Sequence, residues 1–348
     1  KMFEKLRSLI FKLDPETAHN LAIKALKFNK IPNFSIDKNN QRYLETKLFG
    51  KKISNPIGVA AGFDKNAEVY NSLFNLNFGF VEVGTVTPLK QYGNPKPRVF
   101  RLEEDEALIN RLGFNNSGAD IISKYISDNK PNGLLGVNIG PNKDTKDRLN
   151  DYSLCFNKFH NICDYLTINI SSPNTENLRD FHDNEKLDNL LGKLNQERIK
   201  IKSSIPLLVK ISPDINHDQI ENMCEIIFNN KINGIILSNT TDKNRAELKN
   251  LSKHQKGGLS GKPLEVHSNI LINKFYKIIK NKIPIIGVGG VDSGKSAYEK
   301  FISGASFVQL YTGMVYRGPN VVSKISKELT EILKSKGIKN YQDIIGTK

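Results

Sequence analysis

Eight short apolar segments recur between residues 56 and 312, and stretches with the spacing of amphipathic helices separate them. Uninterrupted apolar runs of this length are typical of parallel strands with both faces buried. Parallel strands that alternate with helices predict an α/β fold, and eight of them predict a closed (β/α)8 barrel, the TIM barrel. A doubly wound open sheet is the alternative, which we disfavour because no segment has the character of an edge strand. The predicted strands are residues 56–62, 80–87, 134–140, 165–171, 206–212, 234–240, 284–290 and 307–312.

The first 30 residues have another pattern, that of two short amphipathic helices. The apolar stripe of the first helix consists of Phe3, Leu6, Ile10 and Leu13. Asp14 is the expected N-cap of the second helix and Pro15 its expected first residue. The apolar face of the second helix consists of Ala18, Leu21, Ala22 and Ala25. Basic amphipathic helices of this kind lie in a membrane interface, and a helical lid packed on the barrel is the alternative.

A polar connector is expected over residues 31–50, with a short strand pair within "LETKLFGKKIS". Nothing in the composition of residues 55–320 indicates a linker, so we treat this region as one unit. The sequence therefore predicts an N-terminal amphipathic helical extension, residues 1–40, followed by a barrel domain, residues 41–348.

The chain is strongly basic, with 51 Lys and Arg residues against 36 Asp and Glu residues and a formal net charge of +15. Nucleic acids and anionic membranes attract such a chain. A nucleic-acid site would gather its basic residues on one face, and here they are spread along the sequence without an Arg-rich block. We therefore interpret the excess as diffuse surface charge and expect no nucleic-acid partner.

The three cysteines, Cys155, Cys163 and Cys224, form neither a zinc-binding spacing nor a disulfide framework. This pattern indicates a reducing compartment and no metal site. No apolar run is long enough to span a bilayer. Charged residues inside the N-terminal apolar stretch argue against a secretory signal peptide.

Polar residues follow most of the predicted strands where the apolar run ends. "INISSPNT", residues 168–175, is one example, and alone it would be explained by an ordinary turn. In a (β/α)8 barrel, however, the carboxyl ends of the strands form the active site. Neutral amides there, together with Lys65 and Lys210, favour a planar, anionic ligand that is hydrogen-bonded along its edge.

The segment "GGVDSGKS", residues 289–296, matches the phosphate-binding loop of nucleotide hydrolases. We disfavour this interpretation because the motif follows the seventh strand and no strand ends in an Asp that could hold Mg²⁺. Glycines after strands seven and eight of a barrel have another use, since backbone N–H groups there commonly bind a phosphate.

Seven motifs together resemble the quinone-dependent class of the dihydroorotate dehydrogenase family, and "LDPETAH" (13–19) extends the resemblance to the N-terminus. The motifs are "AAGFDKN" (60–66), "NRLGFNN" (110–116), "NISSPNT" (169–175), "SNTT" (238–241), "GGLSGKPL" (257–264), "GVGGVDSG" (287–294) and "VQLYTG" (308–313). The resemblance implies that the barrel binds FMN and that the N-terminal extension binds the membrane and a quinone. "TENLRD", which follows Asn174, matches no family motif with assurance.

The resemblance also implies a reaction in de novo pyrimidine biosynthesis. Dihydroorotate loses its C5 proton to a base and its C6 hydride to flavin N5, which gives orotate. The base is a serine in the quinone-dependent class and a cysteine in the soluble class, and the matching position here is Ser172. Thr175 and Phe114 match the neighbours of that base.

The family carries over two sets of ligand-binding positions. The substrate set is Lys65, Asn110, Arg111, Leu112, Gly113, Phe114, Asn169, Asn174, Asn239 and Thr240. The FMN set is Ala61, Gly62, Phe63, Asp64, Lys65, Thr85, Asn138, Asn169, Lys210, Ser238, Gly261, Gly290, Tyr311 and Thr312. Lys210 resembles the lysine beside flavin N1 and O2, where positive charge stabilises the reduced anion. His19 and Arg101 resemble quinone-site residues.

The expected location is peripheral, on the cytoplasmic face of a bacterial inner membrane, because no transit peptide precedes the helices. Two alternatives stay open. One is a flavin barrel that reduces uridine in transfer RNA, which the positive charge would suit but which needs a catalytic cysteine at a strand end. The other is a basic nucleic-acid-binding protein without enzymatic activity.

Overall fold

The computed structural model describes residues 2–28 and 37–348, and within them eight parallel strands close into a barrel. The order around the barrel is β10-β12-β13-β3-β4-β7-β8-β9. The strands are β3 (Ile57–Val59), β4 (Phe80–Val86), β7 (Leu134–Ile139), β8 (Tyr165–Asn169), β9 (Leu207–Ile211), β10 (Gly234–Leu237), β12 (Ile285–Val288) and β13 (Phe307–Leu310). Each lies inside one of the predicted segments, so the predicted fold class is confirmed.

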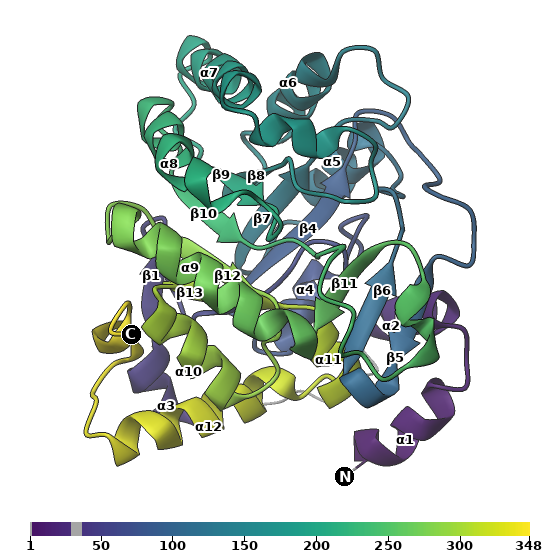
Figure 1. Cartoon of the computed structure of the whole chain (residues 1–348), viewed down its shortest axis with the longest axis vertical. Helices are drawn as coiled ribbons and strands as arrows, with labels where there is room; N and C mark the ends of the chain where they lie inside the picture. The colour runs from purple at the N-terminus through teal and green to yellow at the C-terminus, as the bar shows by residue number, and fades with distance from the viewer. Residues whose placement is uncertain (1, 29–36) are drawn as a thin grey trace.

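Helices cover the outside of the barrel and share one apolar core with the outward side chains of the strands (Figure 1). They are α4 (Tyr70–Asn75), α5 (Ala119–Asp128), α6 (Arg148–Phe159), α7 (Asn184–Lys200), α8 (Ile220–Asn229), α9 (Glu265–Ile279), α10 (Gly294–Ser303), α11 (Thr312–Arg317) and α12 (Val321–Ser335). Because helices bury the outer face and side chains fill the interior, both faces of each strand are buried, which accounts for the largely apolar sequence pattern.

A short antiparallel hairpin closes the amino end of the barrel and confirms the predicted strand pair. It consists of β1 (Thr46–Leu48) and β2 (Lys51–Ile53). Leu48 and Ile53 pack inside the barrel against an apolar layer that includes Phe80 and Tyr165. The connector prediction was wrong over Lys38–Leu44, which form α3 with Asp37 as N-cap. Residues 31–36 of that connector lie outside the described residues.

A second antiparallel sheet lies at the carboxyl end of the barrel, and the sequence pattern did not predict it. It is formed by β5 (Val99–Leu102), β6 (Ala107–Asn110) and β11 (Gly258–Gly261), in the order β11-β6-β5. Its strands come from two connections of the barrel, and Gly258 pairs with Asn110 across them. The sheet therefore forms a wall beside the strand ends, where an active site is expected.

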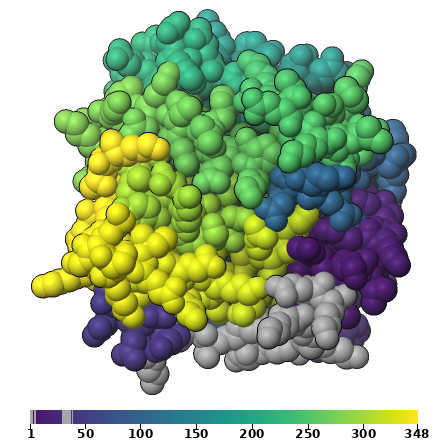
Figure 2. All heavy atoms as spheres, turned by 60° about the horizontal axis from the view of Figure 1, so that its bottom comes forward, coloured from purple at the N-terminus to yellow at the C-terminus, as the bar shows by residue number. Residues whose placement is uncertain are grey.

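The N-terminal residues form α1 (Met2–Ile10) and α2 (Pro15–Lys27), which confirms the two predicted helices. Asp14 is the N-cap, because its carboxylate accepts the backbone N–H of Thr17 at 2.9 Å. The two helices lie beside β5 and form one margin of the molecule (Figures 1 and 2). In the described part of the chain, no helix has both the length and the hydropathy needed to cross a bilayer.

The predicted apolar face of α2 overlaps only in part with the face that the barrel buries. Ile23 and Leu26 are the buried residues of the helix, whereas Leu21 is 50% exposed and Ala22 is exposed. The prediction was therefore right in part, since Ala18 and Ala25 are half-buried, and wrong for Leu21 and Ala22, which face away from the core. The expected boundary between extension and barrel at residue 40 stays a prediction.

Candidate active site

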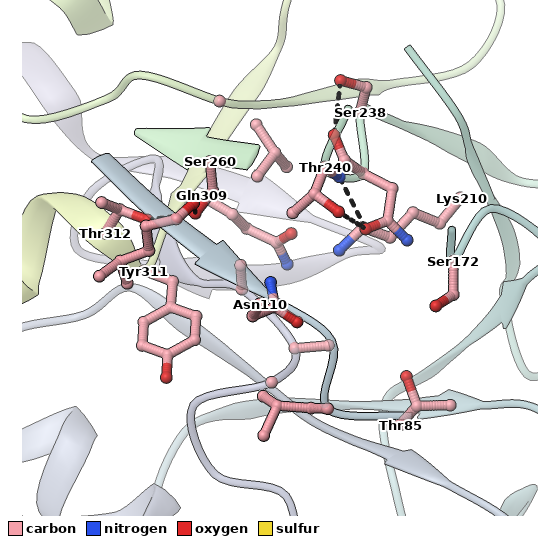
Figure 3. Close-up of a pocket in the computed structure, with 18 of the residues that line it drawn as sticks. Thr85, Asn110, Ser172, Lys210, Ser238, Thr240, Ser260, Gln309, Tyr311 and Thr312 are labelled. Atoms are coloured by element: carbon pink, nitrogen blue, oxygen red, sulfur yellow. Dashed lines mark hydrogen bonds between the residues drawn. The ribbon is translucent and has the colours of Figure 1, made fainter. Parts of the chain in front are cut away.

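A cavity opens at the carboxyl ends of the barrel strands, between them and the wall of β5, β6 and β11. Its empty space is about 1120 Å³, which includes open solvent at the mouth. Ser172 and Lys210 lie toward one end, and Tyr311, Thr312 and Ser260 toward the other (Figure 3). The cavity therefore has two ends with different side chains.

Most of the residues that the sequence predicted for the site line this cavity. From the substrate set they are Lys65, Asn110, Leu112, Gly113, Phe114, Asn169, Asn174, Asn239 and Thr240. From the FMN set they are Ala61, Gly62, Thr85, Ser238, Gly261, Gly290, Tyr311 and Thr312, together with Lys65, Asn169 and Lys210. Ser172 lines it as well. The structure thus brings together residues from the ends of seven of the eight strands and their loops; β7 is the exception.

Ser172 is buried and follows the end of β8, where its hydroxyl oxygen accepts the backbone N–H of Asn174 at 3.2 Å. The Asn174 side-chain amide donates in turn to Oδ1 of Asn110 at 3.4 Å. Ser171 points elsewhere: its hydroxyl donates to Oδ1 of Asn169 at 3.0 Å, and the residue does not line the cavity. The alternation expected at the strand end therefore separates the two serines.

Amide side chains from β8 and β10 are bonded to one another around the cavity. Nδ2 of Asn239 donates to Ser171 Oγ at 2.9 Å and to Oδ1 of Asn169 at 3.3 Å. Oδ1 of Asn239 accepts the backbone N–H of Thr240 at 2.7 Å. These contacts fix the orientation of the amide groups, which suits them to recognise the edge of a polar ring.

Two lysines supply positive charge to the cavity. The β8–β9 register places Lys210 beside Asn169, and burial lowers the pKa of Lys210, which the Glu82 carboxylate partly opposes. Burial also lowers the pKa of Lys65 to about 8, with the Glu16 carboxylate acting in the opposite direction. Both ammonium groups are thus poised to gain from a nearby anion, since an opposite charge restores their charged form.

A buried carboxylate lies in the barrel interior below the cavity. Glu82 accepts hydrogen bonds from Asn138 Nδ2 at 2.8 Å, Tyr165 OH at 3.0 Å, Thr167 Oγ1 at 3.1 Å and Gln309 Nε2 at 3.1 Å. Gln309 lines the cavity, and its Oε1 is buried without a hydrogen-bond partner among the described residues. We did not predict Glu82 or Gln309 for the site, although a charged and an amide residue inside apolar strand runs were a usable signal.

Glycines and hydroxyl groups form the other end of the cavity. Gly261 and Gly290 have φ angles of +100° and +78°, in the left-handed region that glycine favours. A Cβ on Gly290 would lie 2.4 Å from Cβ of Glu265, so only glycine fits there. Ser260, which we did not predict, shares a hydrogen bond of 2.9 Å with Thr312 Oγ1. Exposed backbone N–H groups and hydroxyls of this kind suit a phosphate group.

Four residues of the predicted substrate and FMN sets do not line the cavity. The Asp64 carboxylate instead accepts the backbone N–H groups of Glu68 and Val69, at 2.7 and 2.8 Å, and burial raises its pKa to about 6. Asn138 is directed into the barrel toward Glu82. Arg111 donates to Gln255 and stacks on Phe100, and Phe63 packs edge-on against Tyr311. These four residues support the cavity wall from behind.

The two predicted quinone residues make different contacts. The His19 ring on α2 packs edge-on against Phe63, with centroids 5.2 Å apart, and burial lowers its pKa to about 3. Arg101 donates to the carbonyl oxygens of Phe11 and Leu13, at 2.6 and 2.7 Å. His19 thus lies directly behind the cavity wall, whereas Arg101 fastens the turn between α1 and α2.

A second arginine, which the sequence did not predict, fastens α2. Arg98 donates from Nε and Nη2 to the two carboxylate oxygens of Glu16, at 3.0 and 2.6 Å. This forked pair is largely buried and holds the pKa of Glu16 below its usual value. Bidentate arginine–carboxylate pairs fix geometry as well as adding energy.

The glycine-rich segment at 289–296 forms part of the cavity wall and the start of α10, and it does not form the phosphate-binding loop of a nucleotide hydrolase. Gly289 and Gly290 line the cavity, whereas Ser293 and Ser296 form the capping box that begins α10. The Lys295 side chain is exposed and does not line the cavity. In a phosphate-binding loop of the hydrolase type this lysine would reach the phosphates.

Comparison with known proteins agrees with the geometry. A family model described as dihydroorotate dehydrogenase matches residues 43–333. A protein named dihydroorotate dehydrogenase (quinone) from Bartonella tribocorum is 44% identical over 341 residues, which cover 97% of this chain and 94% of the relative. Its namesake from Idiomarina loihiensis is 43% identical over 335 residues, with 94% and 100% covered.

A crystal structure of DHODH from Eimeria tenella in complex with ferulenol superposes with a TM-score of 0.92 at 36% identity. The superposition covers 96% of this chain and 95% of that one. The fold and the cavity together define an oxidoreductase of the α/β barrel class. The chain belongs to the dihydroorotate dehydrogenase family.

Proposed function

We propose that this protein oxidises dihydroorotate to orotate in pyrimidine biosynthesis, with FMN as the hydride acceptor and a membrane quinone as the final electron acceptor. The observation that carries the proposal is the placement of Ser172. Its buried hydroxyl shares one cavity with the amides of Asn110, Asn174 and Asn239 and with Lys65. A base, an edge-reading amide set and a cation for a carboxylate are the groups that dihydroorotate needs.

The cavity also fits FMN, and flavin dependence is general in this family. The left-handed glycines and the hydroxyls of Ser260 and Thr312 fit its phosphate. The partnerless Oε1 of Gln309 is a buried acceptor that a ring N–H would satisfy. The flavin ring would lie at the end of the cavity that Ser172 and Lys210 line, and Lys210 supplies positive charge there. FMN, when bound, supplies the hydride acceptor of the reaction.

In this proposal Ser172 removes the C5 proton. A serine hydroxyl is a weak base at neutral pH, so its position and a dry surrounding must assist it. Ser172 is only 5% exposed and lines the cavity. Its hydroxyl oxygen accepts a hydrogen bond from the backbone N–H of Asn174. The amides hold the ring edge, and Lys65 pairs with the substrate carboxylate. Hydrogen bonds fix Ser172, Asn174 and Asn239 before substrate arrives, which lowers the entropic part of the barrier.

We further propose that α1 and α2 lie on the membrane, on the cytoplasmic face of a bacterial inner membrane. Quinone-dependent members of the family are membrane-associated in general. Four leucines of this segment, Leu6, Leu9, Leu13 and Leu21, are between 40% and 60% exposed. Behind them, His19 packs on the cavity wall through Phe63 and Tyr311. The helix pair could thus connect a lipid phase, in which quinones dissolve, to the cavity.

A purified sample tests this function directly. We expect a yellow protein whose flavin absorbance is bleached by dihydroorotate without air and restored by a quinone. A yellow protein that dihydroorotate fails to bleach, but that reduces uridine in transfer RNA, would favour the other flavin barrel. That reaction needs a cysteine, and Cys155, Cys163 and Cys224 all lie away from the cavity. A colourless protein with steeply salt-dependent binding to nucleic acid would overturn the assignment altogether.

A further inference from the structure

Arg179 joins three of the loops that form the rim of the cavity. It lies in η2 (Leu178–His182), within the "TENLRD" segment that matched no motif. Its Nε donates to the carbonyl oxygen of Ser171 at 3.2 Å, and its Nη2 donates to the carbonyl oxygen of Thr240 at 3.1 Å. One guanidinium group therefore connects the loop after β8 to the loop after β10.

Two carboxylates hold the same guanidinium group from its other side. Nη1 of Arg179 lies 3.1 Å from Oδ2 of Asp214 and 3.2 Å from Oδ1 of Asp242. Asp214 belongs to the loop after β9, is only 4% exposed, and also accepts the hydroxyl of Thr241. The arginine is thus tied to the loop after β9 as well, through a largely buried ion pair.

His182 closes the arrangement through the backbone. Its Nε2 accepts the backbone N–H of Ser212 at 3.2 Å, so its Nδ1 carries the proton and donates to the carbonyl oxygen of Arg179 at 2.8 Å. Burial lowers the pKa of His182 to about 4, which keeps this neutral tautomer over the physiological range. We call Arg179, His182, Asp214 and Asp242 the rim clamp.

None of the four clamp residues lines the cavity, yet the clamp acts on residues that do. The carbonyl group of Ser171 belongs to the peptide unit that carries the N–H of Ser172. Thr240, whose carbonyl oxygen accepts from Arg179, also donates its backbone N–H to Oδ1 of Asn239. Arg179 thus links the loop of the base to the loop of Asn239, which also meet where the Asn239 amide donates to Ser171 and Asn169.

We propose that Arg179 is a positioning residue that holds the Ser172 loop and the Asn239–Thr240 loop at the spacing needed for proton removal from bound substrate. This inference rests on the function proposed above and adds the part of the structure that sets its geometry. A displacement of about 1 Å at a reacting group costs on the order of 10²-fold in rate. A planar guanidinium is suited to this task because its N–H donors point in fixed directions, unlike those of an ammonium group.

The test compares Arg179→Lys with Arg148→Lys in the full-length, flavin-loaded protein. Arg148, the first residue of α6, is the matched control: it donates to the carbonyl oxygen of Glu176 at 2.6 Å in the same loop, and within the described residues no hydrogen bond or ion pair joins it to the loops after β9 and β10. Flavin content, orotate affinity and the rate of flavin reduction by saturating dihydroorotate are measured for each protein. We expect Arg179→Lys to slow reduction per bound flavin by about 10- to 100-fold with unchanged flavin content. We expect Arg148→Lys to match the parent protein.

A double variant separates positioning from loss of folding. If Arg179 acts through Ser172, the change Arg179→Lys should cost less than about threefold in a Ser172→Ala background, because coupled residues are non-additive. Full additivity, or an unchanged rate per flavin in Arg179→Lys, would overturn the inference.

If Arg179→Lys does not yield flavin-loaded protein, Asp214→Asn decides, since it removes one contact of the clamp and keeps the side-chain shape. A loss of about threefold or more per flavin supports the clamp, and an unchanged rate overturns it. A parent protein that dihydroorotate never bleaches would instead overturn the proposed function.

Discussion

The rim of the barrel lines the cavity and the N-terminal helix pair lies behind the cavity wall, and the two regions are built differently. At the rim, polar side chains bond to one another and to backbone groups across several loops, as Asn239 and Arg179 do. The helix pair is instead fastened by a few arginines, with Arg98 and Arg101 among them, and leaves leucines exposed. The rim is therefore suited to hold reacting groups at fixed distances, and the helix pair is suited to meet an apolar phase.

The largest effect should follow from Ser172→Ala at the rim. This variant should retain FMN and bind orotate, while flavin reduction by dihydroorotate slows by about 10²- to 10⁴-fold, the usual contribution of a positioned base. Rapid-mixing absorbance measurements without air give the rate. Reduction at a near-normal rate would show that another group takes the proton.

A smaller effect should follow from Lys210→Ala, also at the rim. Removing its charge from the flavin-ring end of the cavity should lower flavin content, or the rate of flavin reduction, by about 10- to 100-fold. The reason is that hydrogen bonds to charged groups contribute roughly 1.5–3 kcal/mol. Lys295→Ala is the matched control and should change neither quantity, since Lys295 is exposed away from the cavity. If the parent protein hydrolyses ATP and the Lys295→Ala variant does not, a nucleotide hydrolase would be favoured over the flavin enzyme.

The helix pair can be tested through its exposed leucines. Replacing Leu6, Leu9, Leu13 and Leu21 by Ser should weaken binding to lipid vesicles by about tenfold or more, because each leucine loses part of the roughly 1.5–3 kcal/mol of its burial. Leu251→Ser is the control, since that residue is 90% exposed on the barrel. Cosedimentation with vesicles measures both. Equal vesicle binding by the fourfold variant and the parent would argue for a lid that stays on the protein.

The smallest expected effect concerns the charge of Lys65. Burial lowers the pKa of this ammonium group to about 8, so it is charged below that pH and neutral above it in the free protein. Orotate affinity should therefore fall by about tenfold between pH 7 and pH 9. Lys65→Arg should remove this dependence, because arginine stays charged. Constant affinity of the parent protein over that range would exclude Lys65 as the partner of the carboxylate.

The sequence allowed the barrel to be predicted because its strands are buried on both faces, which leaves predominantly apolar runs. It allowed the rim to be predicted because polar residues begin where each run ends. The sheet of β5, β6 and β11 was missed because its strands are four residues each and pair between Asn110 and Gly258, far apart in sequence. Such pairing leaves no local periodicity.

Side-chain direction was the other limit. Asn138 lies near the end of an apolar run, yet it does not line the cavity: its amide joins Glu82 to Thr85 and Asn169, which do. The buried face of α2 was misjudged in part for a related reason: amphipathicity shows that a helix has two faces, but not which apolar residues the barrel will cover. Arg179 gave no signal, because its contacts with Ser171 and Thr240 exist only once three loops meet.

The central claim is that the barrel carries out dihydroorotate oxidation by itself and that the helix pair serves only the exchange with quinone. The most direct test removes residues 1–30 and follows both half-reactions of the flavin in one sample. We predict that dihydroorotate still bleaches the flavin at the parent rate, that a long-chain quinone no longer restores it, and that the protein leaves the membrane fraction. Unchanged quinone turnover and membrane partition after this truncation would contradict the account.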